Sequence, residues 1–430
     1  MSISLSHFTQ LIKGEIQLTS SKSESNRALI IRALCGKNFE MENLATAEDT
    51  VILKKTLHSI LHLSTTNNVL DVGLAGTAMR FLTAYLAIQN GEWTLTGSSR
   101  MKERPIRLLV TALHQMGAEI EYIEKEGFPP LKIKGKELIG GKIQVDGSVS
   151  SQYISALLLI APQLKKGLQL DFIGELTSKP YIEMTINMMC YFGVSAAWKN
   201  NSITVNNGNY KAKDFIVEAD WSAASYWYSI VALAKEAEIT LFGLQQNSLQ
   251  GDAVVAKIYE NFGVKTEYLN NGVRLTKTSD FGLRTSDFRL NFSNCPDLAQ
   301  AVAVTCAALN VPAKLTGLST LRIKETDRIL ALQTELCKLG YNVEVEGDDL
   351  IILSSLRTEQ RGVKQSVSNN KIASCLAMTN TIKTYNDHRM AMAFAPLALL
   401  YPITIENPDV VIKSYPNFWK DLERVGFVIE

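Results

Sequence analysis

Hydrophobic and polar residues follow one pattern that recurs six times along the chain. Each copy begins with a polar stretch rich in Ser, Thr or Asp, continues as an apolar stretch rich in Ala and Leu, and ends in a short apolar run that stops at Gly or Asn. The longer stretch, after residues that cap helices, predicts a buried helix, and the short run predicts a strand. The copies cover residues 23–43, 76–97, 150–174, 222–243, 297–317 and 387–407.

A second helix pattern, amphipathic and ending at a glycine, lies between these copies. A glycine just after the last helical turn favours the left-handed conformation that ends a helix. These glycines recur roughly 70 to 90 residues apart, which is the period expected of one β-α-β-α-β-β unit. They are Gly117, Gly193, Gly263, Gly340 and Gly426.

The number of units predicts the domain organisation. A chain of 430 residues is too long for one hydrophobic core, so six units indicate an α/β fold of two domains with three units each. The chain opens with a strand pattern and closes on an incomplete unit, so we expect its two ends to complete one domain together. The N-terminal domain is predicted over 20–218, the second over 1–19 plus 219–430, and the hinge near residues 19 and 219.

Composition excludes several classes of protein. Hydrophobic residues make up 46% and charged residues 20%, no window approaches 18 uninterrupted apolar residues, and the net charge of +1 argues against a nucleic-acid binder. The N-terminal residues lack the pattern of a signal peptide. The six cysteines form no CxxC pair, which predicts reduced thiols and a cytoplasmic protein.

The polar stretches hold the candidate chemistry. If they open helices, they present free backbone N–H groups and the positive end of the helix dipole, which favour anions. Arg binds carboxylate or phosphate bidentately and Lys supplies a movable charge, so the mixture indicates small polyanions. Spacing alone therefore predicts a two-domain α/β protein with an anionic ligand between the domains. The candidates are Lys22, Ser23, Arg27, Gly76, Thr77, Arg80, Arg100, Arg104, Ser150, Ser151, Gln152, Ser178, Tyr181, Asp297, Lys324, Glu325, Arg328, Asp387, His388, Arg389 and Lys413.

Other classes of site lack a motif. The chain has no HExxH, no GxxxxGK[ST] and no GxGxxG after a strand. His58 and His62 have the spacing of metal ligands on a helix, but no third ligand accompanies them, so we expect them to line a helix face. The polar stretch 358–381 is expected to form a flexible surface segment.

Seven motifs at these positions resemble those of the enolpyruvyl transferases, most closely the branch that acts on shikimate 3-phosphate. The resemblance extends over nearly the whole chain, and AGTAMR, KETDR and DHRMAM occurring together in this order make it specific. The motifs are SSKSESNRAL (20–29), AGTAMR (75–80), RMKERPI (100–106), GSVSSQY (147–153), SKPYIE (178–183), KETDR (324–328) and NDHRMAM (386–392).

The resemblance implies a reaction and a fold. The enolpyruvyl group of phosphoenolpyruvate would pass to the 5-hydroxyl of shikimate 3-phosphate with release of phosphate, in the shikimate pathway to aromatic amino acids. The domains would be inside-out α/β domains that close over the substrates. The resemblance implies no metal or organic cofactor, and the expected partners are the two small-molecule substrates of a monomer, with neither nucleic acid nor membrane.

The same motifs imply the residues that hold the two substrates. Shikimate 3-phosphate is expected against Lys22, Ser23, Arg27, Ser150, Ser151, Gln152, Ser178, Tyr181, Asp297 and Lys324. Phosphoenolpyruvate is expected against Lys22, Gly76, Thr77, Arg104, Gln152, Glu325, Arg328, His388, Arg389 and Lys413.

The chemistry requires an acid and a base, because the methylene of phosphoenolpyruvate gains a proton while the attacking hydroxyl loses one. The family pattern assigns Asp297 as the base and Glu325 as the proton donor to the methylene. Lys22 and Lys413 remain candidates for part of the donor's work. The clustered cations would stabilise the charge that develops on the departing phosphate.

Two positions depart from the family pattern. Leu74 and Phe81 replace an Asn and a Pro that usually flank AGTAMR. Both lie beside Gly76 in the sequence, where any side chain would project into the pocket, so we expect them to affect the shape of the phosphoenolpyruvate site.

Two alternatives remain beside this hypothesis. The sister transferase that acts on UDP-N-acetylglucosamine shares the architecture, but it typically has a reactive Cys in the region of residues 100–107, where this chain has none. A binding protein without turnover would keep the anion pocket, but the presence of Asp297, Glu325, Lys22 and Lys413 argues against it.

Overall fold

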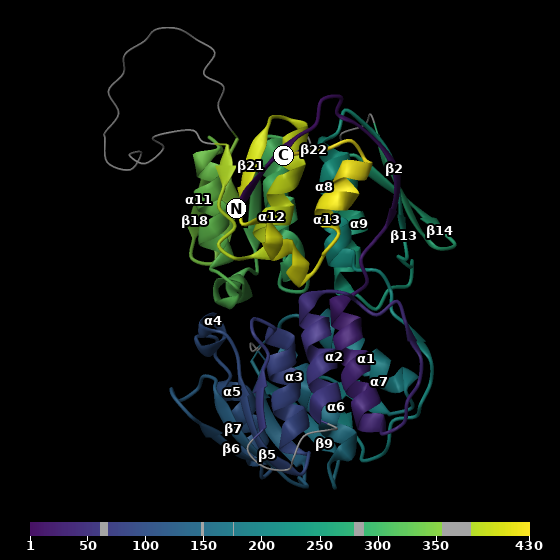
Figure 1. The fold of residues 1–430 in the computed structure, drawn as a ribbon, viewed down its shortest axis with the longest axis vertical. Coiled ribbons are helices and arrows are strands. Elements are labelled where there is room, and N and C mark those ends of the chain that lie inside the picture. Colours follow the sequence, from purple (N-terminus) through teal and green to yellow (C-terminus); the bar gives the residue numbers. More distant parts are fainter. Residues whose placement is uncertain (61–67, 148–149, 175, 279–287, 355–379) are drawn as a thin grey trace.

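The chain folds into two lobes of similar construction (Figure 1). The computed structural model describes residues 1–60, 68–147, 150–174, 176–278, 288–354 and 380–430. His62 and nearly all of the polar stretch 358–381 lie outside the described residues. No helix among the described residues has both the length and the apolar character that crossing a membrane requires.

The N-terminal lobe contains the first three units. Its helices are α1 (Lys22–Cys35), α2 (Glu48–Ile60), α3 (Gly76–Ala87), α4 (Ser99–Lys102), α5 (Arg107–Gln115), α6 (Ser151–Ile160), α7 (Lys179–Tyr191) and the 3₁₀ turn η1 (Ala161–Gln163). Its strands are β3 (Met41–Glu42), β4 (Asn68–Asp71), β5 (Gly91–Thr96), β6 (Glu119–Tyr122), β7 (Leu131–Gly135), β8 (Gly141–Asp146), β9 (Leu168–Ile173), β10 (Ala196–Lys199), β11 (Ser202–Val205) and β12 (Phe215–Ile216).

The C-terminal lobe contains the other three units and the first two strands of the chain. Its helices are α8 (Trp221–Leu233), α9 (Val255–Glu260), α10 (Ala299–Ala308), α11 (Arg328–Lys338), α12 (His388–Phe394) and α13 (Phe418–Arg424), with 3₁₀ turns η2 (Gly251–Val254), η3 (Pro296–Leu298), η4 (Ser319–Ile323), η5 (Ala395–Leu399) and η6 (Pro408–Lys413). Its strands are β1 (Ser2–Ser6), β2 (Leu11–Gln17), β13 (Glu236–Phe242), β14 (Val264–Leu269), β15 (Gly272–Lys277), β16 (Phe288–Asn291), β17 (Ala313–Thr316), β18 (Val343–Glu346), β19 (Asp349–Ile352), β20 (Thr381–Ile382), β21 (Ile403–Glu406) and β22 (Val428–Ile429).

The structure repeats the predicted β-α-β-α-β-β unit. In the sheet β8-β9-β11-β10, β8 runs parallel to β9, α6 connects them, and α7 leads to the antiparallel hairpin of β10 and β11. Five four-stranded sheets of this order occur among the described residues, whereas the first unit shows the two-stranded sheet of β12 and β3. The predicted helix-ending glycines all have positive φ, from 72° at Gly263 to 99° at Gly426.

Three strands join sheets far from their own place in the sequence. β1 pairs with both β21 and β22, so strands from the two ends of the chain lie in one sheet. β2 pairs with β13 of the C-terminal lobe, and β12 pairs with β3 of the N-terminal lobe. The two connecting segments between the lobes lie side by side, because Ser21 N donates to Glu218 O at 2.8 Å and Asp220 N to Thr19 O at 2.8 Å.

Each lobe has its own hydrophobic core with helices at its centre. One core combines residues from Leu5 to Leu18 with residues from Ala219 to Phe427, and the other extends from Ala28 to Tyr210. All residues of α3 are buried, as expected of a helix that is apolar on all sides. The sheets lie around these helices (Figure 1). This is the predicted inside-out α/β architecture.

Candidate active site

A cavity of about 310 Å³ lies between the lobes, and its lining comes from the beginnings of helices in both. From the N-terminal lobe the first residues of α1, α3 and α6 and the residue before α7 reach it. From the C-terminal lobe the starts of α8, α11 and α12 and the turn before α10 reach it. Helix N-termini directed at one space create a positive potential, so the cavity is suited to anions.

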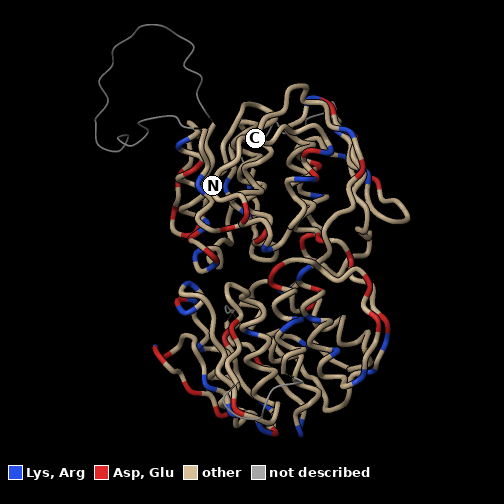
Figure 2. The backbone as a smooth tube through the Cα atoms, in the orientation of Figure 1, with Lys and Arg blue, Asp and Glu red and all other residues tan. Residues whose placement is uncertain are grey.

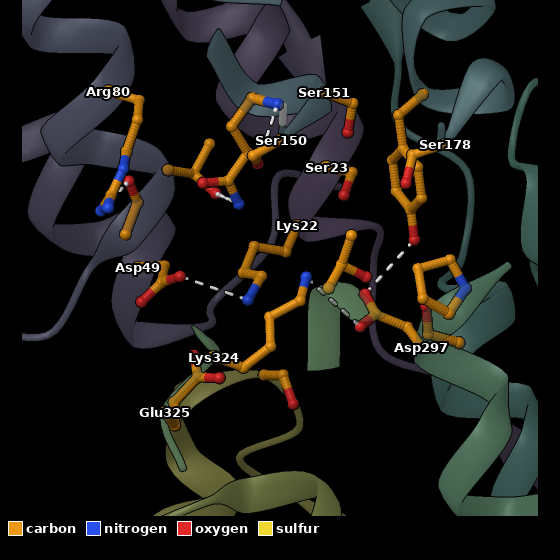
Figure 3. A pocket seen from close by; sticks show the side chains of 18 of the residues that line it. Lys22, Ser23, Asp49, Arg80, Ser150, Ser151, Ser178, Asp297, Lys324 and Glu325 are labelled. Carbon is orange, nitrogen blue, oxygen red and sulfur yellow. Dashed lines mark hydrogen bonds and ion pairs between the residues drawn. The ribbon is translucent and has the colours of Figure 1, made fainter. Parts of the chain in front are cut away.

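The structure brings the predicted residues together. Every residue that the motifs assign to a substrate or to acid–base chemistry lines this cavity, apart from Lys413. Of the other candidates, Arg80 lines it, whereas Arg100 and Asp387 do not. Lys413 is buried beside the cavity and forms an ion pair with Glu325. Figure 3 shows Lys22 and Lys324 extending into the cavity from opposite lobes. Their roles in binding and catalysis stay predictions.

Asp297 lies among cations of the C-terminal lobe. Its carboxylate is 2.9 Å from Arg389 Nη2, 3.1 Å from Arg328 Nη1 and 4.0 Å from Lys324 Nζ. Tyr181, from the other lobe, donates its hydroxyl to Asp297 Oδ2 at 3.3 Å. Burial alone would raise the pKa of Asp297, but Arg389, Lys324 and Arg328 lower that pKa by more. Asp297 is therefore ionised and able to accept a proton.

Glu325 is held as a carboxylate by two cations. Arg328 Nη2 donates to its Oε2 at 2.9 Å, and the Lys413 ammonium contacts its Oε1. Burial favours the neutral acid, but the charges of Lys413 and Arg328 outweigh it and hold the pKa of Glu325 well below its usual value. Glu325 is consequently a carboxylate whose two oxygens face Lys413 and Arg328.

Arg328 connects the acidic groups on this side of the cavity. Its guanidinium is 2% exposed and donates to Asp387 at 2.7 Å as well as to Asp297 and Glu325. Asp387 in turn caps α12 by accepting the backbone N–H of Arg389 at 2.8 Å. A buried arginine bound to three carboxylates fixes their mutual positions.

In the N-terminal lobe, Arg27 is a buried arginine whose hydrogen bonds join several helices. It donates to Thr185 Oγ1 at 2.8 Å, to Ser155 Oγ at 3.0 Å and to the carbonyl of Tyr181 at 3.1 Å. These bonds join α1 to α6 and α7. Burial lowers the pKa of Arg27 to about 10, so the side chain stays charged at neutral pH. The Phe81 ring lies 5.6 Å from its guanidinium carbon and lines the cavity, whereas Leu74 is not among the lining residues.

Arg104 lies directly over the start of α3. A Cβ added to Gly76 would come within 2.6 Å of Arg104 Nη1 and 2.9 Å of Nη2. Arg104 is 8% exposed, and among the described residues its Nε has no hydrogen-bond partner. A buried N–H without a partner is costly unless a ligand supplies an acceptor. Gly76 therefore gives Arg104 room to face an anion in the cavity.

His388 is a buried neutral imidazole at the start of α12. Burial, and next the charge of Lys22, hold the pKa of His388 well below its usual value. Both ring nitrogens lack a hydrogen-bond partner among the described residues. One nitrogen of a neutral imidazole carries a proton, so the ring can still donate to a ligand oxygen.

Several residues that line the cavity are not among the candidates predicted from the sequence. Asp49 binds Lys22 at 3.2 Å, and Tyr226 accepts a hydrogen bond from Arg389 Nη1 at 3.3 Å. Asp220 caps α8 and accepts the backbone N–H of Lys22 at 3.4 Å. Asp49 lies in the first turn of α2 and Asp220 caps α8, and an acidic residue at a helix start is a usable signal, but Tyr226 lies inside an apolar helix and carries none.

Comparison with known proteins gives one consistent family. The family model described as EPSP synthase (3-phosphoshikimate 1-carboxyvinyltransferase) matches residues 8–422. A protein of that enzyme name from Bacteroides fragilis (strain YCH46) is 49% identical over 97% of each chain, and one from Haemophilus influenzae (strain PittEE) is 36% identical over 96% of each. A solved structure of EPSP synthase from Acinetobacter baumannii is similar in fold, with a TM-score of 0.76 at 21% identity, over 100% of this chain and 99% of that one.

Proposed function

The chain belongs to the EPSP synthase (3-phosphoshikimate 1-carboxyvinyltransferase) family, and we propose that the cavity between its lobes is where it carries out that family's reaction. The enzyme transfers the enolpyruvyl group of phosphoenolpyruvate to the 5-hydroxyl of shikimate 3-phosphate and releases phosphate, a step of aromatic amino acid biosynthesis. The observation that carries the proposal is the convergence of cations and helix starts on one cavity between the lobes.

Shikimate 3-phosphate occupies the side of the cavity formed by the N-terminal lobe. Its phosphate lies against the hydroxyl groups and helix starts of α6 and α7, with Lys22 and Arg27 supplying charge. Its ring hydroxyls face Asp297 and Lys324 across the cavity. The residues on its side are Lys22, Ser23, Arg27, Ser150, Ser151, Gln152, Ser178 and Tyr181.

Phosphoenolpyruvate lies deeper between the lobes, where the guanidinium groups face each other. Arg104 contacts it from α3's side, and Arg389 and Arg328 contact it from the C-terminal lobe. Lys22 and Lys413 complete the positive surroundings of its carboxylate and phosphate. Bidentate arginine contacts fix the plane of such groups as well as their position.

Addition begins when the 5-hydroxyl oxygen bonds to C2 of phosphoenolpyruvate. Asp297 takes the hydroxyl proton while the Glu325–Lys413 pair delivers a proton to C3, so that the tetrahedral intermediate forms without net change of charge on the substrates. Elimination then returns a proton from C3 to the pair as the C–O bond to phosphate breaks, and the proton held by Asp297 passes to the departing phosphate, which restores both groups. Arg104, Arg389 and Lys22 stabilise the charge that moves onto the departing phosphate.

The proposal also includes the domain boundaries, the oligomeric state and the cellular location of the protein. The moving bodies are residues 20–218 and residues 1–19 plus 219–430, joined at a hinge near residues 19 and 219, where the two connecting segments run together.

The cavity is formed within one chain, which supports a monomer whose partners are small anions rather than nucleic acid. The described cysteines form no disulfide with one another, which supports a cytoplasmic location.

Phosphate release tests the assignment. The purified protein receives phosphoenolpyruvate with either shikimate 3-phosphate or UDP-N-acetylglucosamine, and released phosphate is measured. We expect phosphate release from phosphoenolpyruvate with shikimate 3-phosphate as the acceptor, and none with UDP-N-acetylglucosamine. Release only with the UDP-sugar would identify the sister transferase, and release with neither would identify a binding protein without turnover.

A further inference from the structure

The lobes touch through Arg100, a candidate residue that the family motifs assign to neither substrate and that does not line the cavity. Arg100 lies on α4 of the N-terminal lobe, which faces the 3₁₀ turn η4 of the C-terminal lobe across the gap in Figure 1. Its Nε donates to the carbonyl of Glu325 at 3.1 Å and its Nη2 donates to the carbonyl of Lys324 at 3.2 Å. One side chain therefore holds the backbone of two consecutive site residues from the opposite lobe.

Within the C-terminal lobe, the segment that contains Lys324 and Glu325 is held by side-chain contacts on both sides of it. Arg322, just before it, binds Asp327 at 3.0 Å and Asp348 at 2.6 Å, and Asp327 caps α11 through the backbone N–H groups of Ile329 and Leu330. Lys324 and Glu325 lie between these anchors. Among the described residues, the backbone carbonyls of Lys324 and Glu325 accept hydrogen bonds from Arg100.

We propose that Arg100 is a positioning residue that fixes the Lys324–Glu325 backbone when the lobes close. The inference rests on the proposed function, because it assigns Arg100 a part in that reaction. Backbone contact leaves the Glu325 carboxylate available to Lys413 and Arg328, so Arg100 orders the Glu325–Lys413 pair without competing for the carboxylate. Since the bonds cross between the lobes, moving the lobes apart would break them, so closure of the lobes and alignment of the proton donor become one event.

The residue type fits this role. A guanidinium offers several N–H donors in a fixed plane, so it can reach two neighbouring carbonyls together, whereas an ammonium is a single point with rotating donors. Glu103 binds the remaining side of the guanidinium at 2.9 Å and orients it. The Arg100 side chain is 40% exposed, so its removal does not open a buried core.

The experiment compares Arg100→Ala and Arg100→Lys with Lys102→Ala, a control on the same helix whose ion pair with Glu124 stays within its own lobe at 2.6 Å. Steady-state phosphate release gives kcat and KM for both substrates, calorimetry gives Kd for shikimate 3-phosphate, and thermal unfolding reports folding. We expect kcat to fall about 10- to 100-fold in Arg100→Ala, as for loss of charge-assisted hydrogen bonds. Kd for shikimate 3-phosphate and Tm should stay at wild-type values, and Arg100→Lys should recover part of kcat.

The outcomes separate this inference from the proposed function. An inactive wild-type protein would refute the proposed function itself. An active wild type with unchanged kcat in Arg100→Ala would overturn the positioning role. So would a loss of kcat that Lys102→Ala shares, or one accompanied by an equal loss of shikimate 3-phosphate affinity, because either result indicates a general disturbance of the lobe.

Discussion

At the scale of single residues, the surroundings of Asp297 decide its chemistry. Three cations lie within 4.0 Å of its carboxylate and hold its pKa below the usual value although the group is buried. A low pKa makes Asp297 a weak base in the empty cavity. An anionic substrate that engages Arg389 and Lys324 reduces this stabilisation, so the basicity of Asp297 is expected to rise when substrate is bound.

Replacing Asp297 by Asn tests its role as the base. Asn keeps the size of the side chain but accepts no proton, so kcat should fall at least about 100-fold, the lower range for loss of general base catalysis. Affinity for shikimate 3-phosphate, measured by calorimetry, should change little. Asp171→Asn, which removes a surface partner of Lys142, serves as a control and should behave as wild type. Wild-type turnover in Asp297→Asn would remove Asp297 as the base.

Gly76→Ala tests the space beneath Arg104. The new Cβ would lie 2.6 Å from Arg104 Nη1, so the guanidinium must move away from its anion position. We expect KM for phosphoenolpyruvate to rise about tenfold, because one charge-assisted contact is weakened, while KM for shikimate 3-phosphate stays near the wild-type value. Gly208→Ala is the matched control, since nothing lies within 4 Å of its Cβ. Equal KM values in all three proteins would contradict the predicted contact.

At the scale of elements, the start of α1 is tied to the connecting segments by buried carboxyl groups. Glu24 accepts the backbone N–H of Glu218 at 3.0 Å, and Gln250 Nε2 donates to both carboxyl groups at 3.2 Å. Burial, followed by the charge of Glu218, raises the pKa of Glu24 to about 7. Gln250 belongs to the C-terminal lobe and Glu24 to the N-terminal lobe, so the cluster joins the lobes where the chain crosses between them.

This cluster predicts a pH dependence of stability. A carboxyl group whose folded pKa exceeds its unfolded value of 4.5 keeps its proton longer in the folded state, so it stabilises folding below pH 4.5 and loses that effect as pH rises to about 7. The pKa difference corresponds to about 3 kcal/mol in the free energy of unfolding over this window.

Denaturant unfolding of the wild type and of Glu24→Gln between pH 5 and pH 8 measures this effect. We expect the free energy of unfolding of the wild type to fall more steeply with rising pH than that of the variant. Glu48→Gln, an exposed change at the start of α2, should keep the wild-type slope. Identical slopes in Glu24→Gln and the wild type would refute the linkage.

At the scale of the whole molecule, positive groups of one lobe face positive groups of the other. Lys22 and Arg104 of one lobe and Arg389 and Lys324 of the other line the same cavity, whereas charged residues of both signs occur along the backbone of both lobes (Figure 2). Anionic substrates offset this repulsion and exclude water from the site. The net charge of +1 conceals the arrangement, because acids elsewhere on the chain compensate for the cations of the cavity.

Closure of the lobes is therefore expected to depend on ligand. Small-angle scattering with saturating shikimate 3-phosphate should give a smaller radius of gyration than the protein alone, and Arg100→Ala should show a smaller decrease. Inorganic phosphate at the same ionic strength controls for screening of charge. Scattering that does not change on adding shikimate 3-phosphate would contradict ligand-dependent closure.

Much of the fold and most of the candidate site were predictable because they depend on local patterns. The buried helices α3, α6 and α8, the glycines that end helices, and the polar residues at helix starts all follow from hydrophobic periodicity and capping. The helix-start rule also explains why almost every predicted site residue lines one cavity. Asp49 and Asp220 also lie at helix starts, but outside the motifs on which the predicted site depends.

The sequence by itself determined the repeated unit, the inside-out pattern of apolar helices and the set of ionic side chains, since each depends on residues close together in the chain. Only the tertiary structure decided that β2 and β12 join distant sheets, that Arg328 binds three carboxylates, and that Arg100 reaches the backbone of Lys324 and Glu325. These contacts join residues that can be hundreds of positions apart. Their pairing depends on how two cores pack and close, which no local pattern of polarity specifies.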